Sequence, residues 1–335
     1  MEFEVALPCR CDIVAPGNDK ADPMVTVSEE TAVDYELTAK IATEAFALAN
    51  VHFSAERIKW LYERSFGCGT TVLAAVEDGR KIGQVALIGQ SVCVAGKVHP
   101  AVQLVDLFIL QAYRSAQLVR KLYQEVETFC ARRSIRYILA LPNDKSVLLN
   151  ARFLKLSPLL WLPIRAGVSL RQPTSGRIGH SGLLKAMTPQ QAVELFSGFG
   201  CLASENGSHW DAESLFNRLD DPTRAYAVHT TDNLLLVSSE RKTSGVSYAA
   251  LCAFFARPSA DIAGGEVDDL VRAACRLWKR RAFVYVGTNS RLPKLPGVPL
   301  PARLRRPILV QLRDTCSDGH EVRFDRFQLI DSDFA

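Results

Sequence analysis

The segment VQLVDLFILQAYRSAQLVRKLYQEVETFCARR, residues 102–133, determines the predicted fold, because a strand, a tight turn and a long helix follow one another in it. Its first nine residues, VQLVDLFIL, are apolar and rich in β-forming side chains. The last eighteen, AQLVRKLYQEVETFCARR, place Leu118, Leu122, Val126 and Phe129 at the spacing of one helix face. A strand that turns directly into a helix points the unpaired N–H groups of the first helical turn at one spot, where an anion can bind.

Side chains around this turn are consistent with an anion site. Ser115 stands where a helix N-cap belongs. Arg114, Arg120 and Lys121 add positive charge. Because Arg120 and Lys121 are consecutive on the helix, they point in different directions, and at most one of them faces a ligand. The turn is therefore predicted to bind a pyrophosphate.

Composition limits the class of protein. With 335 residues the chain has room for two domains of about 150 residues each, and 48% hydrophobic residues supply a sizeable core. The net charge of +4 is small and its basic residues are scattered among acids, so nucleic acid is not the expected partner. No apolar run reaches the length of a membrane span, and the N-terminus lacks a signal-peptide layout, so we expect a cytoplasmic protein without a membrane partner.

Nine cysteines are spread along the chain without a repeating pattern. Cys9 and Cys11 form the only close pair, and no second pair lies at zinc-site spacing. We expect reduced, mostly buried thiols and no metal site.

The other elements of the first half follow from hydrophobic period and turn residues. In order they are helices at 31–49 and 54–64, strands at 70–77 and 81–89 joined across Asp78-Gly79, a third strand at 91–94, the central segment, a strand at 135–141, a short helix at 146–154 and a bulged strand at 157–170. Because hairpins rather than helices join the early strands, this order excludes a doubly wound nucleotide fold. It predicts an α+β fold with a mixed central sheet.

The same order of elements returns after a polar, glycine-rich segment at 171–187, which we interpret as a linker. Trp210-Asp211-Ala212-Glu213 repeats the pattern of Phe53-Ser54-Ala55-Glu56, and Asp232-Asn233 takes the place of the first hairpin turn. Two closing strands are expected at 307–313 and 322–330, around a Cys-Ser-Asp-Gly turn. The chain is therefore predicted to hold two tandem copies of one fold, at 1–170 and 188–335.

The element order, with DLFILQAYRSAQLVRKLY (106–123) and ALPNDKS (140–146), resembles the GNAT superfamily of acyl-CoA-dependent N-acyltransferases. In that family a turn of pattern R/Q-x-x-G-x-G/A binds the pyrophosphate of CoA through backbone amides. Arg114 matches the first position, whereas Gln117 and Val119 stand at the two glycine positions, so the CoA-binding turn has drifted. Glycine lets the backbone approach a phosphate closely, but a helix N-terminus offers its amides whatever side chains it carries.

The resemblance implies acetyl-CoA or acyl-CoA as co-substrate, with no permanently bound cofactor. The residues that it places at this co-substrate are Phe108, Ile109, Leu110, Arg114, Ser115, Ala116, Gln117, Leu118, Val119, Arg120, Asn143, Ser146 and Phe153. A subset of the superfamily tolerates a drifted turn and takes acyl groups from acyl carrier protein, which makes that protein an alternative donor.

Asp106 and Asn143 are the candidate catalytic residues. Asp106, on an apolar strand, is suited to take the proton of an attacking amine, directly or through water. The alternative is a structural carboxylate that bonds to a neighbouring loop or pairs with an arginine. Asn143 and Ser146 are suited to form hydrogen bonds with pantetheine or with a substrate carbonyl. The alternative is that they only form the turn at the end of a strand and have no further function. Tyr113 and Tyr123 are candidate acids for a leaving thiolate, although Tyr123 is better explained by packing.

In the second copy the matching turn is Ala263-Gly264-Gly265, followed by Glu266, Asp268 and Asp269. Carboxylates in a first helical turn repel a phosphate. We therefore expect a degenerate C-terminal domain without a cofactor.

The leading hypothesis is an N-acyltransferase that moves an acyl group from acyl-CoA or acyl carrier protein to a small amine. The alternative is a catalytically inactive GNAT-like scaffold that binds a ligand or a partner. The lost turn glycines favour the scaffold, and the retained strand–turn–helix with Arg114 favours the enzyme.

Overall fold

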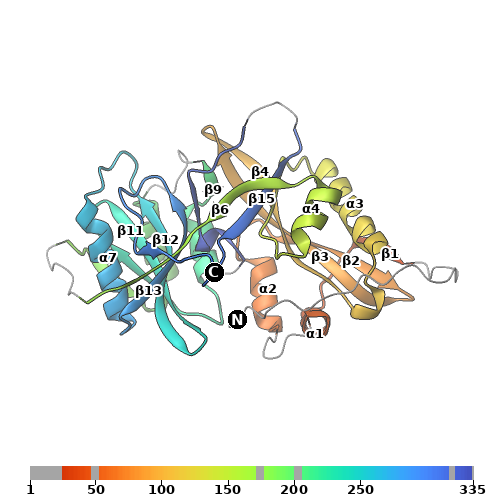
Figure 1. Cartoon of the computed structure of the whole chain (residues 1–335), viewed down its shortest axis with the longest axis horizontal. Helices are drawn as coiled ribbons and strands as arrows, with labels where there is room; N and C mark the ends of the chain where they lie inside the picture. Colours follow the sequence, from red (N-terminus) through yellow and green to blue (C-terminus); the bar gives the residue numbers. More distant parts are fainter. Residues whose placement is uncertain (1–24, 47–52, 171–176, 200–205, 317–320, 334–335) are drawn as a thin grey trace.

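The fold consists of two similar α/β halves placed side by side, the N-terminal half in orange to yellow and the C-terminal half in green to blue (Figure 1). This is a computed structural model, and it describes residues 25–46, 53–170, 177–199, 206–316 and 321–333. Cys9 and Cys11, which are close together in the sequence, and most of the turn at 316–319 lie outside the described residues.

The N-terminal half follows the predicted order closely. Its elements are β1 (Thr26–Glu29), α1 (Tyr35–Phe46), α2 (Ala55–Glu63), β2 (Thr70–Glu77), β3 (Arg80–Val94), β4 (Lys97–Ile109), α3 (Ala116–Arg132), β5 (Tyr137–Ala140), α4 (Ser146–Leu154), β6 (Ser157–Leu162) and β7 (Ile164–Val168). The hairpin at 78–79 and the helices at 116–132 and 146–154 are confirmed. The α+β fold with a mixed sheet is confirmed as well, since β4 pairs antiparallel with β3 and parallel with β5.

Two strand predictions in this half were wrong. Residues 91–94 are not a separate strand but the end of β3, because the chain reverses only at Ala95 and Gly96, whose φ angles are 51° and 75°. Residues 157–170 do not form one bulged strand, because Pro163 separates β6 from β7. A proline cannot donate to a strand ladder, so the break falls there.

The C-terminal half repeats most of this order, although β9 separates α5 from α6 and no helix follows β13 as α4 follows β5 in the described residues. Its elements are β8 (His180–Leu183), α5 (Pro189–Ser197), β9 (Gly207–His209), α6 (Ala212–Leu219), β10 (Tyr226–Thr230), β11 (Leu234–Thr243), β12 (Val246–Ala256), α7 (Gly264–Leu277), β13 (Ala282–Asn289), β14 (Val298–Pro299), β15 (Ile308–Asp314) and β16 (Arg326–Gln328). Part of the expected linker is therefore regular structure, since β8 pairs with β10. The division of the chain at 170 and 188 stays a prediction.

The halves exchange strands reciprocally. β15 lies between β5 and β6 of the N-terminal half, with Val310 opposite Leu160 and Leu312 opposite Leu139. In return, β7 lies between β13 and β14, with Tyr285 opposite Arg165. The two closing strands therefore do not form a hairpin with each other.

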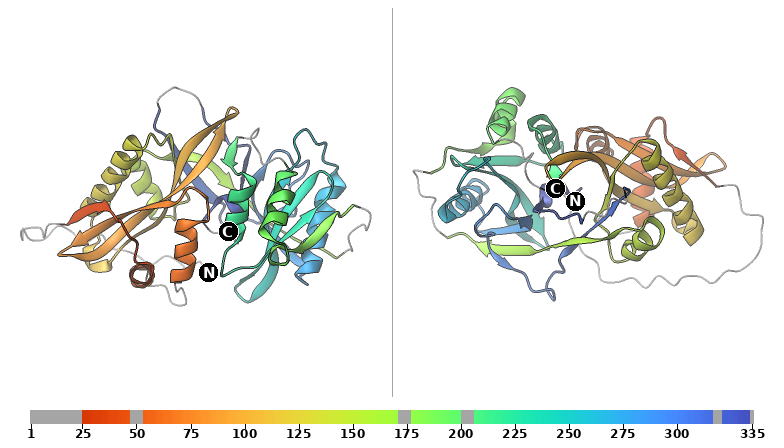
Figure 2. Two further views of the ribbon diagram at one scale, coloured as in Figure 1. Left: turned by 180° about the vertical axis from the view of Figure 1, so that it is seen from behind. Right: turned by 90° about the horizontal axis from the view of Figure 1, so that it is seen from above.

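A shared hydrophobic core joins the halves. It contains Trp60 and Phe66 from the N-terminal half with Trp210 and Tyr226 from the C-terminal half, all at most 5% exposed. Trp60 Nε1 donates to Asn217 O of α6 at 3.1 Å, and Figure 2 shows α2 on the side of its half that faces the green helices. Because each half buries apolar surface against the other, the two copies form one packed unit.

Candidate active site

A β-bulge in β4 positions the first candidate side chain. Ala86 pairs with Val105 and Gln84 with Phe108, so Asp106 and the residue after it oppose a single residue of β3. Asp106 has a φ of 47°, a left-handed value that is rare outside glycine. Strain of this kind and bulges concentrate at functional sites, where they redirect a side chain.

The sheet opens beside this bulge. β4 pairs with β5 only over residues 101–104, and within the part of the chain that the structure describes no strand continues the pairing on that side. The remainder of β4, up to Ile109, then leads into the turn before α3. Apart from Ile109 O, which Arg114 bonds, residues 105–109 therefore have backbone groups at the open edge that an extended ligand can bond in the manner of an added strand.

Asp106 lies in a hydrogen-bonded chain. Tyr62 Oη donates to Asp106 Oδ2 at 2.8 Å, and Gln84 Nε2 donates to Tyr62 Oη at 2.8 Å. Burial raises the pKa of Asp106, against the opposing effects of the Tyr62 bond and the charge of Arg57. Burial also raises the pKa of Tyr62 well above its usual value, so this phenol is a fixed donor and not a proton source near neutral pH.

A second carboxyl group, Asp333, approaches the first from the end of the described chain. Gln103 Nε2 of β4 donates to Asp333 Oδ1 at 3.1 Å. Burial, followed by the nearby charge of Asp106, raises the pKa of Asp333 to about 6. A carboxylate with a pKa near the working pH is well matched to accept a proton. Sequence reasoning missed Asp333, because nothing local connects it to a strand more than two hundred residues away.

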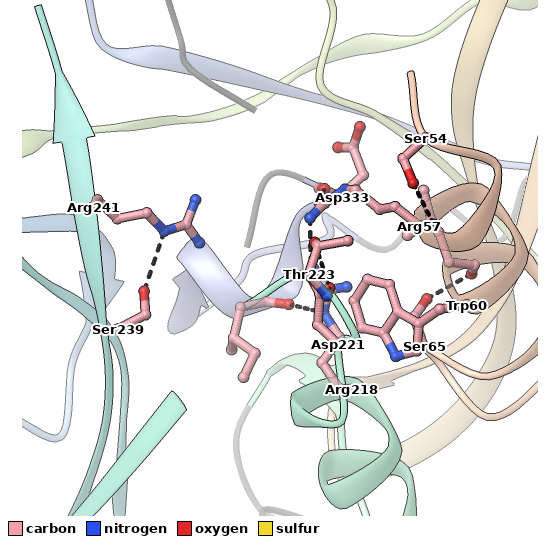
Figure 3. A network of polar contacts seen from close by, with 12 residues as sticks. Ser54, Arg57, Trp60, Ser65, Arg218, Asp221, Thr223, Ser239, Arg241 and Asp333 are labelled. Atoms are coloured by element: carbon pink, nitrogen blue, oxygen red, sulfur yellow. Dashed lines mark hydrogen bonds and ion pairs between the residues drawn. The ribbon is translucent and has the colours of Figure 1, made fainter. Parts of the chain in front are cut away.

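Arginines from both halves hold the segment that carries Asp333 (Figure 3). Arg57 of α2 donates to Asp333 O at 3.2 Å and to Asp221 Oδ2 at 2.9 Å. Arg218 of α6, fully buried, donates to Ile330 O at 3.1 Å and to Ser332 O. These bonds fix Asp333 at the junction of the halves.

The predicted phosphate turn is exposed and partly capped. Ser115 Oγ accepts from the N–H of Leu118 at 3.1 Å, which confirms the predicted N-cap. The N–H groups of Ala116 and Gln117 donate to no acceptor in the described residues. Arg114 does not extend toward them: its Nε donates to Ile109 O at 3.1 Å and a terminal nitrogen donates to Ala45 O. Two amides of the helix start are thus available to an anion, and the contact of Arg114 with phosphate stays a prediction.

The other residues predicted to contact the co-substrate pack on two different sides of the sheet, one covered by α1 and the other by α3. Phe108 and Leu110 pack against α1, with the rings of Phe108 and Phe46 6.3 Å apart. The side chains that pack in the core under α3, by contrast, are Ile109, Leu118, Val119 and Phe153. The structure therefore does not bring all the predicted side chains to one point.

Arg120, Asn143 and Ser146 also make local contacts. The guanidinium of Arg120 lies 5.5 Å from the centre of the Phe153 ring. Asn143 Oδ1 accepts from the N–H groups of Lys145 and Ser146, each at 3.0 Å, and so caps the start of α4. A substrate contact of Asn143 stays a prediction. Tyr123 is buried and donates to Asn150 Oδ1 at 2.6 Å, which agrees with its interpretation as a packing residue.

The matching opening in the C-terminal half is filled by protein. β12 pairs with β13 only over residues 249–251. Gln328 then bonds the free edge, accepting from the N–H of Phe254 at 2.8 Å and donating to Phe254 O at 3.1 Å. At the start of α7, Glu266 accepts from the N–H of Ala263 at 3.2 Å and from Asn233 and Thr231. A ligand backbone and a phosphate would both meet occupied positions here.

The fold matches solved structures of acyltransferases, whereas no protein-family model and no curated sequence matches the chain. A protein from Enterococcus faecalis, named a probable N-acyltransferase, has a TM-score of 0.63 at 11% identity over 87% of this chain and 73% of that chain. A GCN5-related N-acetyltransferase from Anabaena variabilis has a TM-score of 0.62 at 11% identity over 90% of this chain and 75% of that chain.

A third match is N-myristoyltransferase from Saccharomyces cerevisiae with bound myristoyl-CoA, with a TM-score of 0.56 at 11% identity over 88% of this chain and 81% of that chain. At this identity the likenesses establish the fold. The chain has the fold of the GNAT superfamily, in two tandem copies, as the resemblance of residues 106–123 and 140–146 predicted.

The described residues show no built metal site and no helix that could span a membrane. They contain no group of three or more His, Cys, Asp and Glu side chains arranged to hold a metal ion. None of their helices combines the length and the apolar character that crossing a membrane requires.

Proposed function

We propose that the protein is an N-acyltransferase that moves an acyl group from an acyl thioester, acyl-CoA or acyl carrier protein, to a small amine. The observation that carries this proposal is the carboxyl pair Asp106 and Asp333 beside the open edge of β4. The fold supports it, because the similar structures are named N-acyltransferases and one of them holds myristoyl-CoA.

In the proposed reaction the donor lies along the open edge of β4, and its phosphates meet the free amides of Ala116 and Gln117. The neutral amine attacks the thioester carbonyl carbon, which forms a C–N bond as the C–S bond breaks. Asp333, largely ionised above its pKa of about 6, accepts the proton that the nitrogen loses. The sulfur leaves as a thiolate and takes a proton from solvent. Backbone N–H groups of residues 105–109 polarise the carbonyl.

Asp106 has a positioning role in this proposal. Its charge next to Asp333 raises the pKa of Asp333, and the Tyr62 bond holds the Asp106 carboxylate in place. Because the two carboxyl groups are neighbours, their proton equilibria are coupled. The pair, and not one residue, therefore determines how kcat/KM falls as the pH is lowered, which is the acid limb of the pH profile.

The alternative, an inactive scaffold, has support in Arg114, which bonds backbone oxygens rather than facing the helix start. Binding of thioesters separates the two. Acetyl-CoA, palmitoyl-CoA and CoA are titrated into the protein by calorimetry, and amine acylation is followed through the released thiol. Binding together with transfer supports the enzyme. Binding of none of the three rejects a CoA donor, and acylated carrier protein is then titrated in the same way.

A matched pair of variants tests the helix start. Gln117→Glu places a negative charge among the first amides of α3, so we expect CoA to bind about 5-fold or more weakly. Gln124→Glu makes the same change on the exposed face of the same helix, two turns further on, and is expected to leave CoA affinity unchanged. Equal effects of the two substitutions would place the phosphates elsewhere.

A further inference from the structure

Three glutamine side chains are buried on one face of the N-terminal sheet. Gln84 and Gln90 lie on β3 and Gln103 lies on β4, and each is at most 4% exposed. Ile88 is paired with Gln103 and packs in the hydrophobic core that joins the halves. Alternate residues of a strand share a face, and so do paired residues of neighbouring strands. All three amides therefore face the junction of the halves.

Two of these amides are held by the carboxyl pair. Gln84 Nε2 donates to Tyr62 Oη at 2.8 Å, and Tyr62 Oη donates onward to Asp106. Gln103 Nε2 donates to Asp333 Oδ1 at 3.1 Å. The carbonyl oxygen of each amide, Oε1, has no hydrogen-bond partner among the described residues. Because the nitrogen of each amide is held, its oxygen is fixed beside the carboxyl groups.

These two oxygens point to a ligand that donates hydrogen bonds. A buried amide oxygen without a donor is costly, and an N–H or O–H group of a ligand would satisfy it. Asp106 and Asp333 each keep part of their surface exposed, so a group that reaches the carboxyl pair enters beside the oxygens. Ionised carboxyl groups also only accept hydrogen bonds. The site therefore fits a ligand with several donors.

A neutral primary amine brings two N–H groups to this site. In the proposed reaction Asp333 takes the proton of one of them. Gln103 Oε1, on the amide that bonds Asp333, is placed to accept the other. Holding both N–H groups directs the lone pair of the nitrogen toward the thioester.

We propose that Gln103 and Gln84 recognise the acceptor through their side-chain oxygens. Gln103 accepts from the reacting amine, and Gln84 accepts from a second donor group, a hydroxyl or an amino group, on the same acceptor. This inference rests on the proposed function, because it places the acceptor in the same site. It assigns the acceptor to the amino alcohols and diamines.

The test measures kcat/KM with palmitoyl-CoA and acetyl-CoA as donors and three series of acceptors. These are the n-alkylamines, the amino alcohols from ethanolamine to 6-aminohexan-1-ol, and the diamines of the same lengths. We expect at least one amino alcohol or diamine to exceed the alkylamine of its length by about 10-fold or more, because its second donor satisfies a buried oxygen. Equal use of the three series at every length overturns the inference.

Three substitutions by methionine locate the recognition. Gln84→Met should remove the preference for a second donor, mainly through KM. Gln103→Met should lower kcat/KM about 10-fold or more for primary amines and less for their N-methyl derivatives, which lack the second N–H. Gln90→Met is the matched control, because Gln90 is buried on the same face but bonds neither Tyr62 nor Asp333 in the described residues. It should change neither preference, and melting curves confirm that each variant is folded.

The outcomes separate recognition from support. A preference that survives in Gln84→Met, or an equal loss for primary and N-methyl amines in Gln103→Met, overturns the proposed contact of that residue. Where no amine is acylated, the proposed function has failed, and calorimetry with the amino alcohols and diamines alone decides. Binding that Gln84→Met weakens and Gln90→Met does not supports the recognition site, and binding of none of them refutes it.

Discussion

Replacing Asp333 by asparagine removes the negative charge of the side chain but keeps its size and shape. Asparagine keeps an oxygen that accepts from Gln103, so the 3.1 Å bond is retained. The pKa of Asp333 is raised from 3.8 to about 6, so the folded protein binds the proton more tightly than the unfolded chain does. Well below pH 3.8 the carboxyl is neutral in both states, and native and variant proteins should be equally stable. As pH rises to about 6, the native protein loses stability and the variant does not.

The expected size follows from the same pKa. A shift of about two units corresponds to at most about 3 kcal/mol of unfolding free energy above pH 6. With an unfolding entropy of about 2.1 cal/mol/K per residue, this raises the melting temperature of Asp333→Asn by up to about 4 °C. The variant should also lose about 100-fold or more in kcat/KM, together with the acid limb of the pH profile near 6.

Two measurements decide this prediction: melting curves of both proteins from pH 4 to pH 8, and kcat/KM over the same range. A stability difference that does not grow with pH would show that Asp333 titrates near its ordinary pKa. A variant that is stabilised above pH 6 but keeps full activity would confirm the titration and refute the role of Asp333 as proton acceptor.

Two further substitutions test the groups around the site. Tyr62→Phe removes the donor that stabilises the Asp106 carboxylate, so the pKa of Asp106 should rise further. A neutral Asp106 no longer raises the pKa of Asp333, so the pH below which kcat/KM falls should move lower, and an unchanged pH profile would detach Asp106 from the reaction. Ser115→Ala removes the cap on the N–H of Leu118 and should lower the unfolding free energy by about 1 kcal/mol in urea titrations, and an unchanged midpoint would contradict the capping role.

Local patterns predicted the elements well, because their signals lie within a few residues of one another. The apolar spacing at Leu118, Leu122, Val126 and Phe129 and the cap at Ser115 located α3, and Asp78-Gly79 located a hairpin. Local patterns could not predict which distant strands pair with each other. β7 and β15 carry apolar side chains that suit either sheet, so their exchange between the halves could not be predicted from periodicity.

The candidate site was predictable only where it is local. Asp106 was noticed because a carboxylate on an apolar strand is unusual. Tyr62 carries no such signal, since a tyrosine among the apolar residues of a helix is explained by packing. Asp333 and the arginines that hold its segment, Arg57 and Arg218, come together only because α2 and α6 meet at the junction of the halves. Their function depends on tertiary structure, which no local pattern encodes.

The difference between the halves explains why a duplicated fold would use a single donor site. Both sheets open beyond a short parallel pairing, at residues 101–104 in one and 249–251 in the other. The second opening is closed by the side chain of Gln328, and Glu266 caps the adjacent helix start. The strand β16 that carries Gln328 is shortly followed by Asp333, which lies beside β4. On the proposed mechanism, the segment that blocks the C-terminal opening also delivers the proton acceptor to the N-terminal one, so the degenerate copy completes the active copy.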